Sequence, residues 1–485
     1  CAPEAGPCAA AAEAGGSAHP GHRTPRMSPA GSPANRATWS SRLVFLLAAI
    51  GASVGLGNIW KFPYLTGVSG GAAFVLVYLA AVTLVAVPIL VAEMLLGRRG
   101  RHHPAAAVAA VAVQSGASPR WGWIGGLGVL VGWLIMTFYS VIAGWAMAYV
   151  WPTLSGRFGG AGAAEVAAHF NGLQAEPWTL RAWSGLYTAL TAAIVARGLK
   201  GGIERAIIVL MPLLFLALLV LLGYAAVAGE FGAAMRFLFR PEFGRLDGAV
   251  ILAAVGQAFF SIGVGMGILL AYGSYLPRDV SLTRSAFAIA AADTGVAVLA
   301  GIAIFPLVFA NGLDPGEGPG LVFVTLPIAF GSMPAGSLFG GVFFLLLVFA
   351  ALTSSIAILE PMVAWLTERR GWRRPLAAWL AGGAAWVSGL GTVLSFSAWK
   401  DWHPLGLFAR FQGKTFFDLL DYATSSLLMP VSALLIALFV GWRMRPEAAA
   451  DELGLGRGFH FRVWHGLLLR WVVPAAIAVI LFRGL

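Results

Sequence analysis

The stretch GASVGLGNIWKFPY at residues 51–64 places three glycines, a serine and an asparagine inside an otherwise apolar segment. A second stretch, VGQAFFSIGVGMGILLAYGSY at 255–275, combines three more glycines with Ser261. Glycine costs up to about 1 kcal/mol relative to alanine in a helix interior, so we expect both segments to unwind there. Carbonyls freed by unwinding can bind a cation, and the amides that begin the next half-helix can bind a carboxylate. The two stretches together could therefore hold a zwitterion and a cation.

The composition indicates an all-α polytopic membrane protein. Of its 485 residues, 59% are hydrophobic and only 11% are charged, and the mean hydropathy is +0.81. Apolar stretches of about 20 residues, enough to cross the hydrocarbon as a helix, recur along the chain. The net charge of +11 comes from short connections between these stretches. The positive-inside rule explains this charge more simply than nucleic-acid binding does, so we expect no nucleic-acid partner.

We predict eleven spans from the apolar stretches. Their approximate bounds are 42–66, 72–97, 121–150, 180–197, 203–227, 249–275, 284–312, 338–367, 376–396, 417–442 and 467–483. Arginine and lysine gather in the connections after spans 2, 4, 8 and 10, whereas the connection after span 7 carries only Asp314 and Glu317. The bias predicts a plasma (inner) membrane protein with a cytoplasmic N-terminus and an extracytoplasmic C-terminus.

The two interrupted spans are the first of two five-span halves, about 42–227 and 249–442, with 467–483 as an extra span. This correspondence points to inverted repeats around a central site. Glycine also lets membrane helices pack closely, which would be the better explanation for a single interrupted span. Residues 1–38, rich in Ala, Gly, Pro and Ser, are expected to be disordered, with 1–26 upstream of the native start, and 39–485 to form the membrane domain. Both cysteines, Cys1 and Cys8, lie outside that domain, which excludes a disulfide framework within it.

From Trp39 to the end of span 10, the chain resembles the neurotransmitter:sodium symporters, in particular their bacterial sodium-dependent amino-acid transporters. The motifs that carry the resemblance, in the family's order, are GASVGLGNIWKFPYL, GGAAFVLVYL, KGGIERA, AAVGQAFFSIGVGMG, FVTLP and LTSSIAI. The resemblance implies a 5+5 inverted-repeat transporter fold with unwound spans 1 and 6, for which this family is itself a standard example. It also implies coupling to sodium.

The resemblance implies two sodium sites. Both consist of oxygen ligands, which a hard cation such as sodium prefers. The first would use the Ser53 carbonyl, the Asn58 and Ser261 side chains, and Asp293. The second would use the carbonyls of Gly51, Val54 and Ala350 and the hydroxyls of Thr353 and Ser354. The i, i+3, i+4 spacing of Ala350, Thr353 and Ser354 puts them on one helix face. Taken alone, the two hydroxyls could equally pack between helices or bond back to a carbonyl.

The implied substrate is an amino acid. The amides of Leu56 and Gly57 and the hydroxyl of Tyr139 would bind its carboxylate, and the carbonyls of Ser53, Phe260 and Ser261 its amine. The groups around its side chain would be Ile135, Phe260, Gly263, Met266, Ser354 and Ile358. Leucine-type relatives often have larger or aromatic residues at the positions of Gly263 and Met266. This departure favours a neutral, bulky apolar or aromatic amino acid.

Charged pairs on both sides of the site resemble the family's gates. Lys61 and Asp421 would form the outer pair, although Lys61 could instead snorkel to the interface and Asp418 could replace Asp421. The inner gate would comprise Arg36, Glu368, Trp39 and Tyr275. Glu93 and Glu360 are interpreted as structural acids.

Asp293 would lie near mid-bilayer, where a charge costs roughly 2.5–3.5 kcal/mol and needs a partner. Many relatives have asparagine here, and animal relatives use chloride to balance the sodium charge. A carboxylate at residue 293 predicts that chloride is not required. The alternative is a structural acid bonded to neighbouring hydroxyls.

The sequence therefore predicts a sodium symporter that imports an amino acid by alternating access, not an enzyme. Neither a nucleotide-binding glycine loop nor zinc-type histidine spacing occurs in it. Two alternatives stay open: symport of another small amine or osmolyte, and a non-transporting amino-acid sensor. The lipid bilayer and the amino acid are the expected partners, and the oligomeric state is left open.

Overall fold

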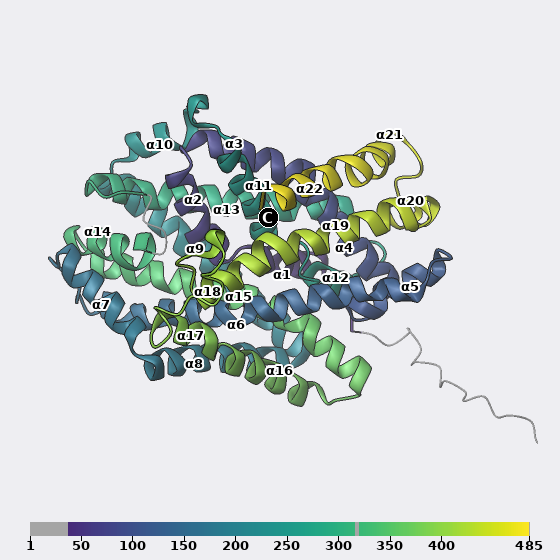
Figure 1. The fold of residues 1–485 in the computed structure, drawn as a ribbon, viewed down its shortest axis with the longest axis horizontal. Coiled ribbons are helices and arrows are strands. Elements are labelled where there is room, and N and C mark those ends of the chain that lie inside the picture. Colours follow the sequence, from purple (N-terminus) through teal and green to yellow (C-terminus); the bar gives the residue numbers. More distant parts are fainter. Residues whose placement is uncertain (1–36, 316–319, 485) are drawn as a thin grey trace, which may run out of the picture. The chain divides into compact units, whose positions relative to one another are not determined.

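The computed structural model describes residues 37–315 and 320–484, and in these ranges it contains helices and loops but no strand (Figure 1). Arg36 and nearly all of the predicted disordered segment 1–38 lie outside the described residues. From Ala37 onward the chain forms one compact unit.

Eight helices or helical runs of the described ranges are long and apolar enough to cross a membrane. Four of them contain one long helix: Pro119–Leu154 (α6, Trp123–Leu154), Leu199–Ala228 (α9, Arg205–Ala228), Leu282–Ala310 (α13) and Gly336–Arg370 (α15). The other four each contain two helices: Ala72–Gly100 (α3, Ala72–Ala81, and α4, Val87–Gly100), Arg374–Phe396 (α16, Arg374–Ser388, and α17, Leu390–Phe396), Phe416–Arg443 (α18, Phe416–Asp421, and α19, Met429–Leu438) and Phe459–Phe482 (α21, Phe459–Phe461, and most of α22, Val473–Gly484). The bent pair α1 (Arg42–Ser53) and Gly57–Val68, which ends with α2 (Phe62–Val68), makes a ninth.

Two of the eleven predicted spans fail this test of length and hydropathy. The first, 180–197, forms the continuous helix α8 (Pro177–Ala196), which carries Arg181 and several hydroxyl side chains. The second, 249–275, forms α11 (Gly248–Ile262) and α12 (Ile268–Ser274), each too short alone because glycines separate them. The structure thus supports eight or nine spans, and the number eleven stays a prediction.

The first predicted interruption is confirmed. Helix α1 starts at the cap Ser41, whose side chain accepts a hydrogen bond from the amide of Val44, and it ends where Val54 is extended (φ −70°, ψ 105°). After a short break the chain resumes at Gly57, bent by 51°. The side chain of Asn58 accepts the Gly55 amide at 3.0 Å. A side chain thus replaces a hydrogen bond that the broken helix lacks.

The second interruption depends on three glycines between α11 and α12. Gly263, Gly265 and Gly267 have φ of 74°, 86° and 71°, in the left-handed region that other residues rarely adopt. A Cβ on Gly265 would lie 2.6 Å from the carbonyl oxygen of Met429. The Gly265 amide donates instead to Glu93 Oε1 at 2.8 Å. Both the conformation and the close backbone approach therefore require glycine at residue 265.

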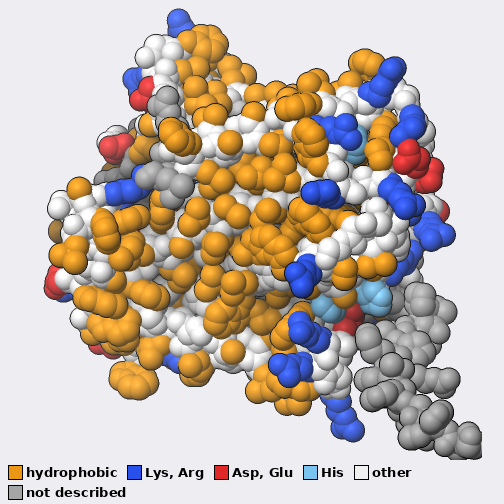
Figure 2. Space-filling model, turned by 45° about the vertical axis from the view of Figure 1, so that its right-hand side comes forward, with side chains coloured by type: hydrophobic (Ala, Val, Ile, Leu, Met, Phe, Trp, Pro, Cys, Tyr) orange, Lys and Arg blue, Asp and Glu red, His pale blue; other side chains and the backbone are white. Residues whose placement is uncertain are grey.

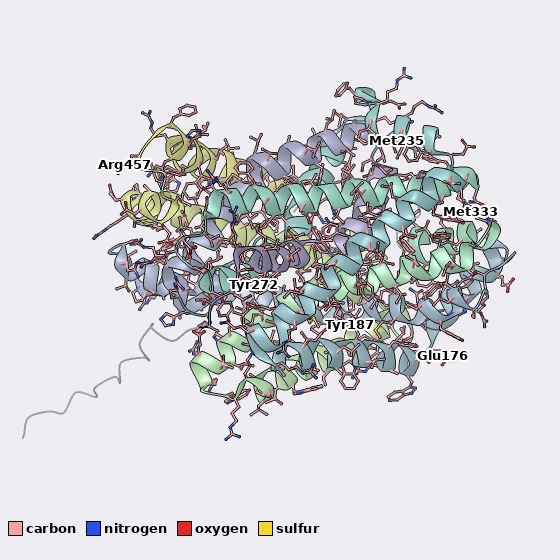
Figure 3. The ribbon with its side chains drawn as sticks, turned by 180° about the vertical axis from the view of Figure 1, so that it is seen from behind. Glu176, Tyr187, Met235, Tyr272, Met333 and Arg457 are labelled. Atoms are coloured by element: carbon pink, nitrogen blue, oxygen red, sulfur yellow. The ribbon has the colours of Figure 1, made fainter. Side chains whose placement is uncertain are left out.

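The connections lie at opposite ends of the long helices. Figure 3 places Arg457 at one end and Glu176, Met235 and Met333 at the other. Figure 2 shows a broad field of hydrophobic side chains with Lys and Arg gathered at one end. This distribution suits a protein with an apolar belt and one basic rim.

The helices that carry the two breaks pack against long unbroken ones. Helix α12 lies along α4, α1 contacts α13 and α15, and α15 packs along both α6 and α9. The breaks are therefore surrounded by protein, which is the condition for irregular backbone at bilayer depth.

Replacement of Gly265 by alanine should destabilise the protein. The left-handed conformation costs a side chain about 1–2 kcal/mol, and the clash with Met429 adds to that. The matched control is Gly256→Ala on α11, where a Cβ meets nothing within 4 Å and alanine should be neutral or stabilising. Thermal unfolding in detergent should give a lower midpoint for Gly265→Ala only. Equal midpoints for the two variants would show that the break does not depend on this glycine.

Candidate functional site

A fully buried polar cluster joins the two breaks to α13. The Asn58 amide group donates to Asp293 Oδ1 at 2.8 Å, to the Asp293 carbonyl at 3.0 Å and to Ser261 Oγ at 3.0 Å. Ser261 Oγ donates to Asp293 Oδ2 at 2.6 Å. All three side chains are buried. Three of the four residues predicted for the first sodium site are thus brought together.

The hydrogen-bond partners of the Asp293 carboxylate are neutral. They are Asn58, Ser261 and Tyr78, whose hydroxyl lies 3.4 Å from Oδ2 and 3.2 Å from Ser261 Oγ. A buried carboxylate at this depth needs a compensating positive charge. The surrounding hydroxyl and carbonyl oxygens fit a sodium ion, which prefers hard oxygen ligands.

Tyr78 was not identified as a site residue from the sequence. It is fully buried on α3 and belongs to the motif GGAAFVLVYL, in which nothing marks its hydroxyl as functional. Its place beside Asp293 becomes apparent only when α3 and α13 are positioned in space.

Ser53, the fourth residue of the predicted first site, links the two breaks directly. Its hydroxyl lies 3.1 Å from the carbonyl oxygen of Ile262, at the end of α11, and 3.2 Å from that of Ala49. The Ser53 hydroxyl thus joins the end of α1 to the end of α11.

The residues predicted for the second sodium site also converge. Ser354 Oγ on α15 donates to the carbonyls of Gly51 and Val54, each at 3.2 Å. Thr353 Oγ1 donates to the Ala350 carbonyl at 2.9 Å, and its Cβ lies 3.2 Å from the position of a Cβ on Gly51. The hydrogen bond of Thr353 stays within its own helix, as in the alternative in which the hydroxyl bonds back to a carbonyl. Ser354 instead bonds to the carbonyls of the broken helix α1.

The predicted carboxylate-binding groups lie beside this second cluster. The Leu56 amide donates to the hydroxyl oxygen of Tyr139 at 3.2 Å. A Cβ on Gly55 would lie 2.7 Å from the Tyr139 oxygen and 2.6 Å from Ser354 Oγ. Gly55 is therefore required for this approach, a role that the sequence did not reveal.

The residues predicted to surround the substrate side chain lie on α6, α11 and α15 and in the second break. The ring of Phe260 lies 3.0 Å from the position of a Cβ on Gly57. A Cβ on Gly132 of α6 would lie 3.4 Å from the Met266 carbonyl oxygen and 3.7 Å from Ile358 Cγ2. A Cβ on Gly263 would lie 4.0 Å from the Met266 sulfur. Ile135 is buried one helical turn after Gly132.

The outer charged pair is present. Lys61 Nζ lies 3.8 Å from Asp421 Oδ1 and 4.3 Å from the centre of the Phe260 ring. The alternative partner, Asp418, is instead engaged in capping α18, where it accepts the Thr415 amide. The geometry therefore favours Asp421 as the partner of Lys61.

On the inner side, Trp39 is almost fully buried. Its amide donates to the Tyr275 carbonyl at 3.2 Å and its indole to the Tyr272 carbonyl at 3.1 Å. Glu368 accepts the amide of His103 at 2.9 Å. Arg36, the predicted partner of Glu368, lies outside the described residues.

Glu360 has the contacts expected of a structural acid. It is fully buried, accepts the hydroxyl of Tyr275 at 2.7 Å and forms an ion pair with Arg374. Arg374 in turn donates to the Val195 carbonyl at 2.9 Å. The ion pair joins α15 to α16, and its hydrogen bonds link it to Tyr275 at the end of α12 and to Val195 on α8.

A model of the sodium:neurotransmitter symporter family matches residues 36–163 and 176–485. The chain belongs to this family.

Relatives with similar lengths support the assignment. The chain is 38% identical to the uncharacterized sodium-dependent transporter YhdH of Bacillus subtilis, over 91% of this chain and 96% of that protein. It is 33% identical to an uncharacterized sodium-dependent transporter of Haemophilus influenzae, over 93% and 98%.

A solved structure extends the likeness to three dimensions. The crystal structure of MhsT in complex with L-phenylalanine superposes with a TM-score of 0.84 at 40% identity, covering 93% of this chain and 100% of that one. The chain is therefore a sodium-dependent transporter of this family with an MhsT-like fold.

Glu360→Gln should destabilise the protein by a few kcal/mol. Loss of one partner from a buried pair costs about 3–5 kcal/mol, and the Arg374 side chain, which is 25% exposed, should bring the cost toward the lower value. Thermal unfolding would measure it. Glu368→Gln is the control, since that carboxylate is 30% exposed and should cost less.

The double variant Glu360→Leu with Arg374→Leu should recover part of the loss, because no buried charge is left unpaired. Equal losses for Glu360→Gln and Glu368→Gln would contradict the proposed importance of the buried pair.

Proposed function

We propose that the chain imports a neutral, bulky apolar or aromatic amino acid together with sodium, by alternating access. The observation that carries this proposal is the cluster of Asn58, Ser261 and Asp293, where both helix breaks meet a carboxylate with neutral partners. A cation there would balance the carboxylate and lie next to backbone groups that suit a zwitterion.

Two sodium ions would drive the transport. The first would be held by Ser53, Asn58, Ser261 and Asp293, and the second by Gly51, Val54, Ala350, Thr353 and Ser354. Since a zwitterion adds no net charge, each ion contributes about 2.3 kcal/mol per 100 mV of membrane potential. Two ions would supply about 4.6 kcal/mol, enough for roughly a thousandfold accumulation before any sodium concentration gradient is counted.

The side-chain pocket supports an apolar or aromatic substrate. Ile135, Phe260, Met266 and Ile358 offer aliphatic, aromatic and thioether surface, and Gly263 leaves space beside Met266. MhsT, whose structure holds L-phenylalanine, is 40% identical to this chain. Such a pocket discriminates modestly between apolar side chains, so a group of amino acids rather than one is expected.

We also propose a cycle in which the two charged pairs close in turn. Lys61 with Asp421 would act as the outer gate, and Trp39, Tyr275, Arg36 and Glu368 as the inner one. The chain would cross the plasma membrane eleven times as two inverted five-span repeats plus one span, with a cytoplasmic N-terminus.

Uptake into proteoliposomes tests the function. With an inward sodium gradient, a labelled mixture of the twenty amino acids should show accumulation of phenylalanine and other large apolar members. The control is an equal potassium gradient, which should give none. Saturable binding without accumulation would identify a sensor. Accumulation of an amine or osmolyte instead of any amino acid would assign a different substrate.

Asp293→Asn tests whether the built-in carboxylate replaces chloride. A Drosophila relative, 27% identical over 67% of this chain, is named a sodium- and chloride-dependent GABA transporter. Uptake by the unaltered chain should be the same in chloride and gluconate. The variant should lose uptake or need chloride, because the sodium charge then lacks its carboxylate. Asp279→Asn, on an exposed loop, is the matched control. Full chloride-independent uptake by Asp293→Asn would contradict the proposal.

A further inference from the structure

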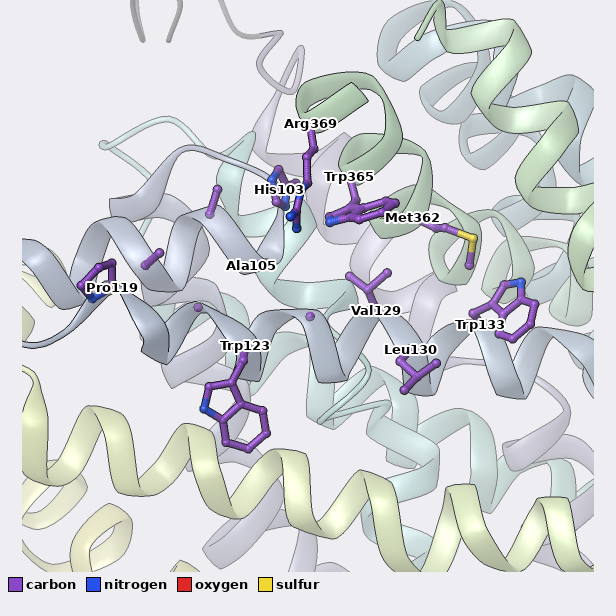
Figure 4. Close-up of a pocket in the computed structure, with 14 residues that line it drawn as sticks. His103, Ala105, Pro119, Trp123, Val129, Leu130, Trp133, Met362, Trp365 and Arg369 are labelled. Atoms are coloured by element: carbon purple, nitrogen blue, oxygen red, sulfur yellow. The ribbon is translucent and has the colours of Figure 1, made fainter. Parts of the chain in front are cut away.

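A groove with a volume of about 900 Å³ lies between α5 (Pro104–Gln114), α6 and α15, away from the substrate and sodium clusters. Figure 4 shows Val129, Leu130 and Trp133 projecting from α6, and Met362, Trp365 and Arg369 from α15. Most of its lining is apolar or small. The lining residues are His103, Ala105, Ala106, Ala109, Pro119, Gly122, Trp123, Gly126, Val129, Leu130, Trp133, Met362, Trp365 and Arg369.

Small residues keep the groove open. The contributions of α5 are alanines, Gly122 directly precedes α6, and Gly126 lies in the first turn of α6. A Cβ on Gly126 would meet no atom within 4 Å, so this glycine is not needed for close packing between helices. In contrast, a Cβ on Gly122 would lie 2.6 Å from the Ala105 carbonyl oxygen. The groove is thus a hollow that the protein's own side chains leave unfilled.

The length of the groove matches one leaflet of a bilayer. From Gly122 to Trp133 the α6 face extends about 16 Å, and half of the hydrocarbon thickness is about 15 Å. Trp123 is 54% exposed, as expected of an indole at the membrane interface. An elongated apolar ligand such as an acyl chain fits this shape better than a compact solute does.

The basic end of the groove provides charge complementarity for an anion. Arg369 is exposed, and its guanidinium lies 5.6 Å from the centre of the Trp365 ring. Arg370 and Arg373 follow on the same chain segment, and Arg120 follows the lining residue Pro119. Glu368, the acid beside Arg369, already accepts the amide of His103. Arginine binds phosphate oxygens with a planar fork, and basic residues at this level attract anionic lipid.

We propose that this groove binds an anionic phospholipid, with an acyl chain along α5 and α6 and the phosphate at Arg369. The inference requires that the chain lies in a membrane, and it does not depend on the proposed substrate or on the sodium stoichiometry. It assigns a binding site to a groove that none of the residues predicted for the sodium or substrate sites lines, and that adjoins the predicted inner-gate residue Glu368.

Native mass spectrometry of the purified full-length chain tests the proposal. Phosphatidylglycerol and phosphatidylcholine with identical acyl chains are titrated separately. The unaltered chain should retain phosphatidylglycerol preferentially. Gly126→Leu should fill the groove and lower retention of both lipids at least about tenfold, roughly the effect of 1.4 kcal/mol. Arg369→Gln should lower retention of phosphatidylglycerol about fivefold and leave phosphatidylcholine unchanged, since one arginine near the surface contributes about that much.

Two matched controls sharpen the test. Gly223→Leu changes an exposed glycine on α9, outside the groove, whose Cβ position, like that of Gly126, meets nothing within 4 Å. Arg284→Gln removes an exposed arginine at the start of α13. Both should retain lipid as the unaltered chain does.

Three outcomes would overturn the proposal. The first is equal lipid retention by Gly126→Leu and Gly223→Leu. The second is an unchanged preference for phosphatidylglycerol in Arg369→Gln, whose exposed side chain makes a folding defect unexpected. The third is a dimer without lipid adducts that dissociates on Gly126→Leu, which would assign the groove to a second copy of the chain.

Discussion

Every backbone amide and carbonyl that a helix break frees inside a bilayer must find a partner within the protein, because hydrocarbon offers none. This constraint shapes the centre of the molecule. The side chain of Asn58 accepts an amide in the first break, Glu93 accepts one in the second, and Gln257 donates to the carbonyl of Gly57 at 2.8 Å. Polar side chains buried in apolar helices are costly, and here Asn58 and Glu93 each pair a backbone amide that the break has freed, while Gln257 adds a second donor to a carbonyl that already accepts the Phe62 amide.

The same constraint explains why the centre suits charged ligands. Carbonyls of Gly51 and Val54 currently accept the hydroxyl of Ser354, a bond that a sodium ion could replace by direct coordination. The Leu56 amide and the Tyr139 hydroxyl could likewise turn from each other to a substrate carboxylate.

Glycine spacing and motif order were enough to predict much of this centre. The breaks at 54–56 and 263–267 follow from residues that weaken a helix, and residues that match the family's site motifs lie around them. What the sequence could not provide is which helices face each other. The contact of Tyr78 with Asp293 and the hydrogen bond from Tyr275 to Glu360 each join elements that are far apart in the chain.

The number of spans was harder to predict than the positions of the breaks, for a physical reason. Helix α8 carries Arg181, whose guanidinium lies 3.7 Å from the centre of the Trp386 ring, and its hydroxyl side chains bond back to carbonyls of the same helix. Such polar groups lower the hydropathy of α8, while the glycines of the second break divide α11 from α12. A test of helix length and hydropathy therefore leaves out two spans that the apolar stretches predict.

The central claim is that the two breaks together hold sodium and a zwitterion. It is tested most directly by a structure determined in sodium with L-phenylalanine. We predict density for one ion among Asn58, Ser261 and Asp293, for a second among Gly51, Val54 and Ser354, and for the amino acid between them with its carboxylate at Leu56. Ligand density elsewhere, with both breaks unchanged and no ion in either cluster, would contradict the account.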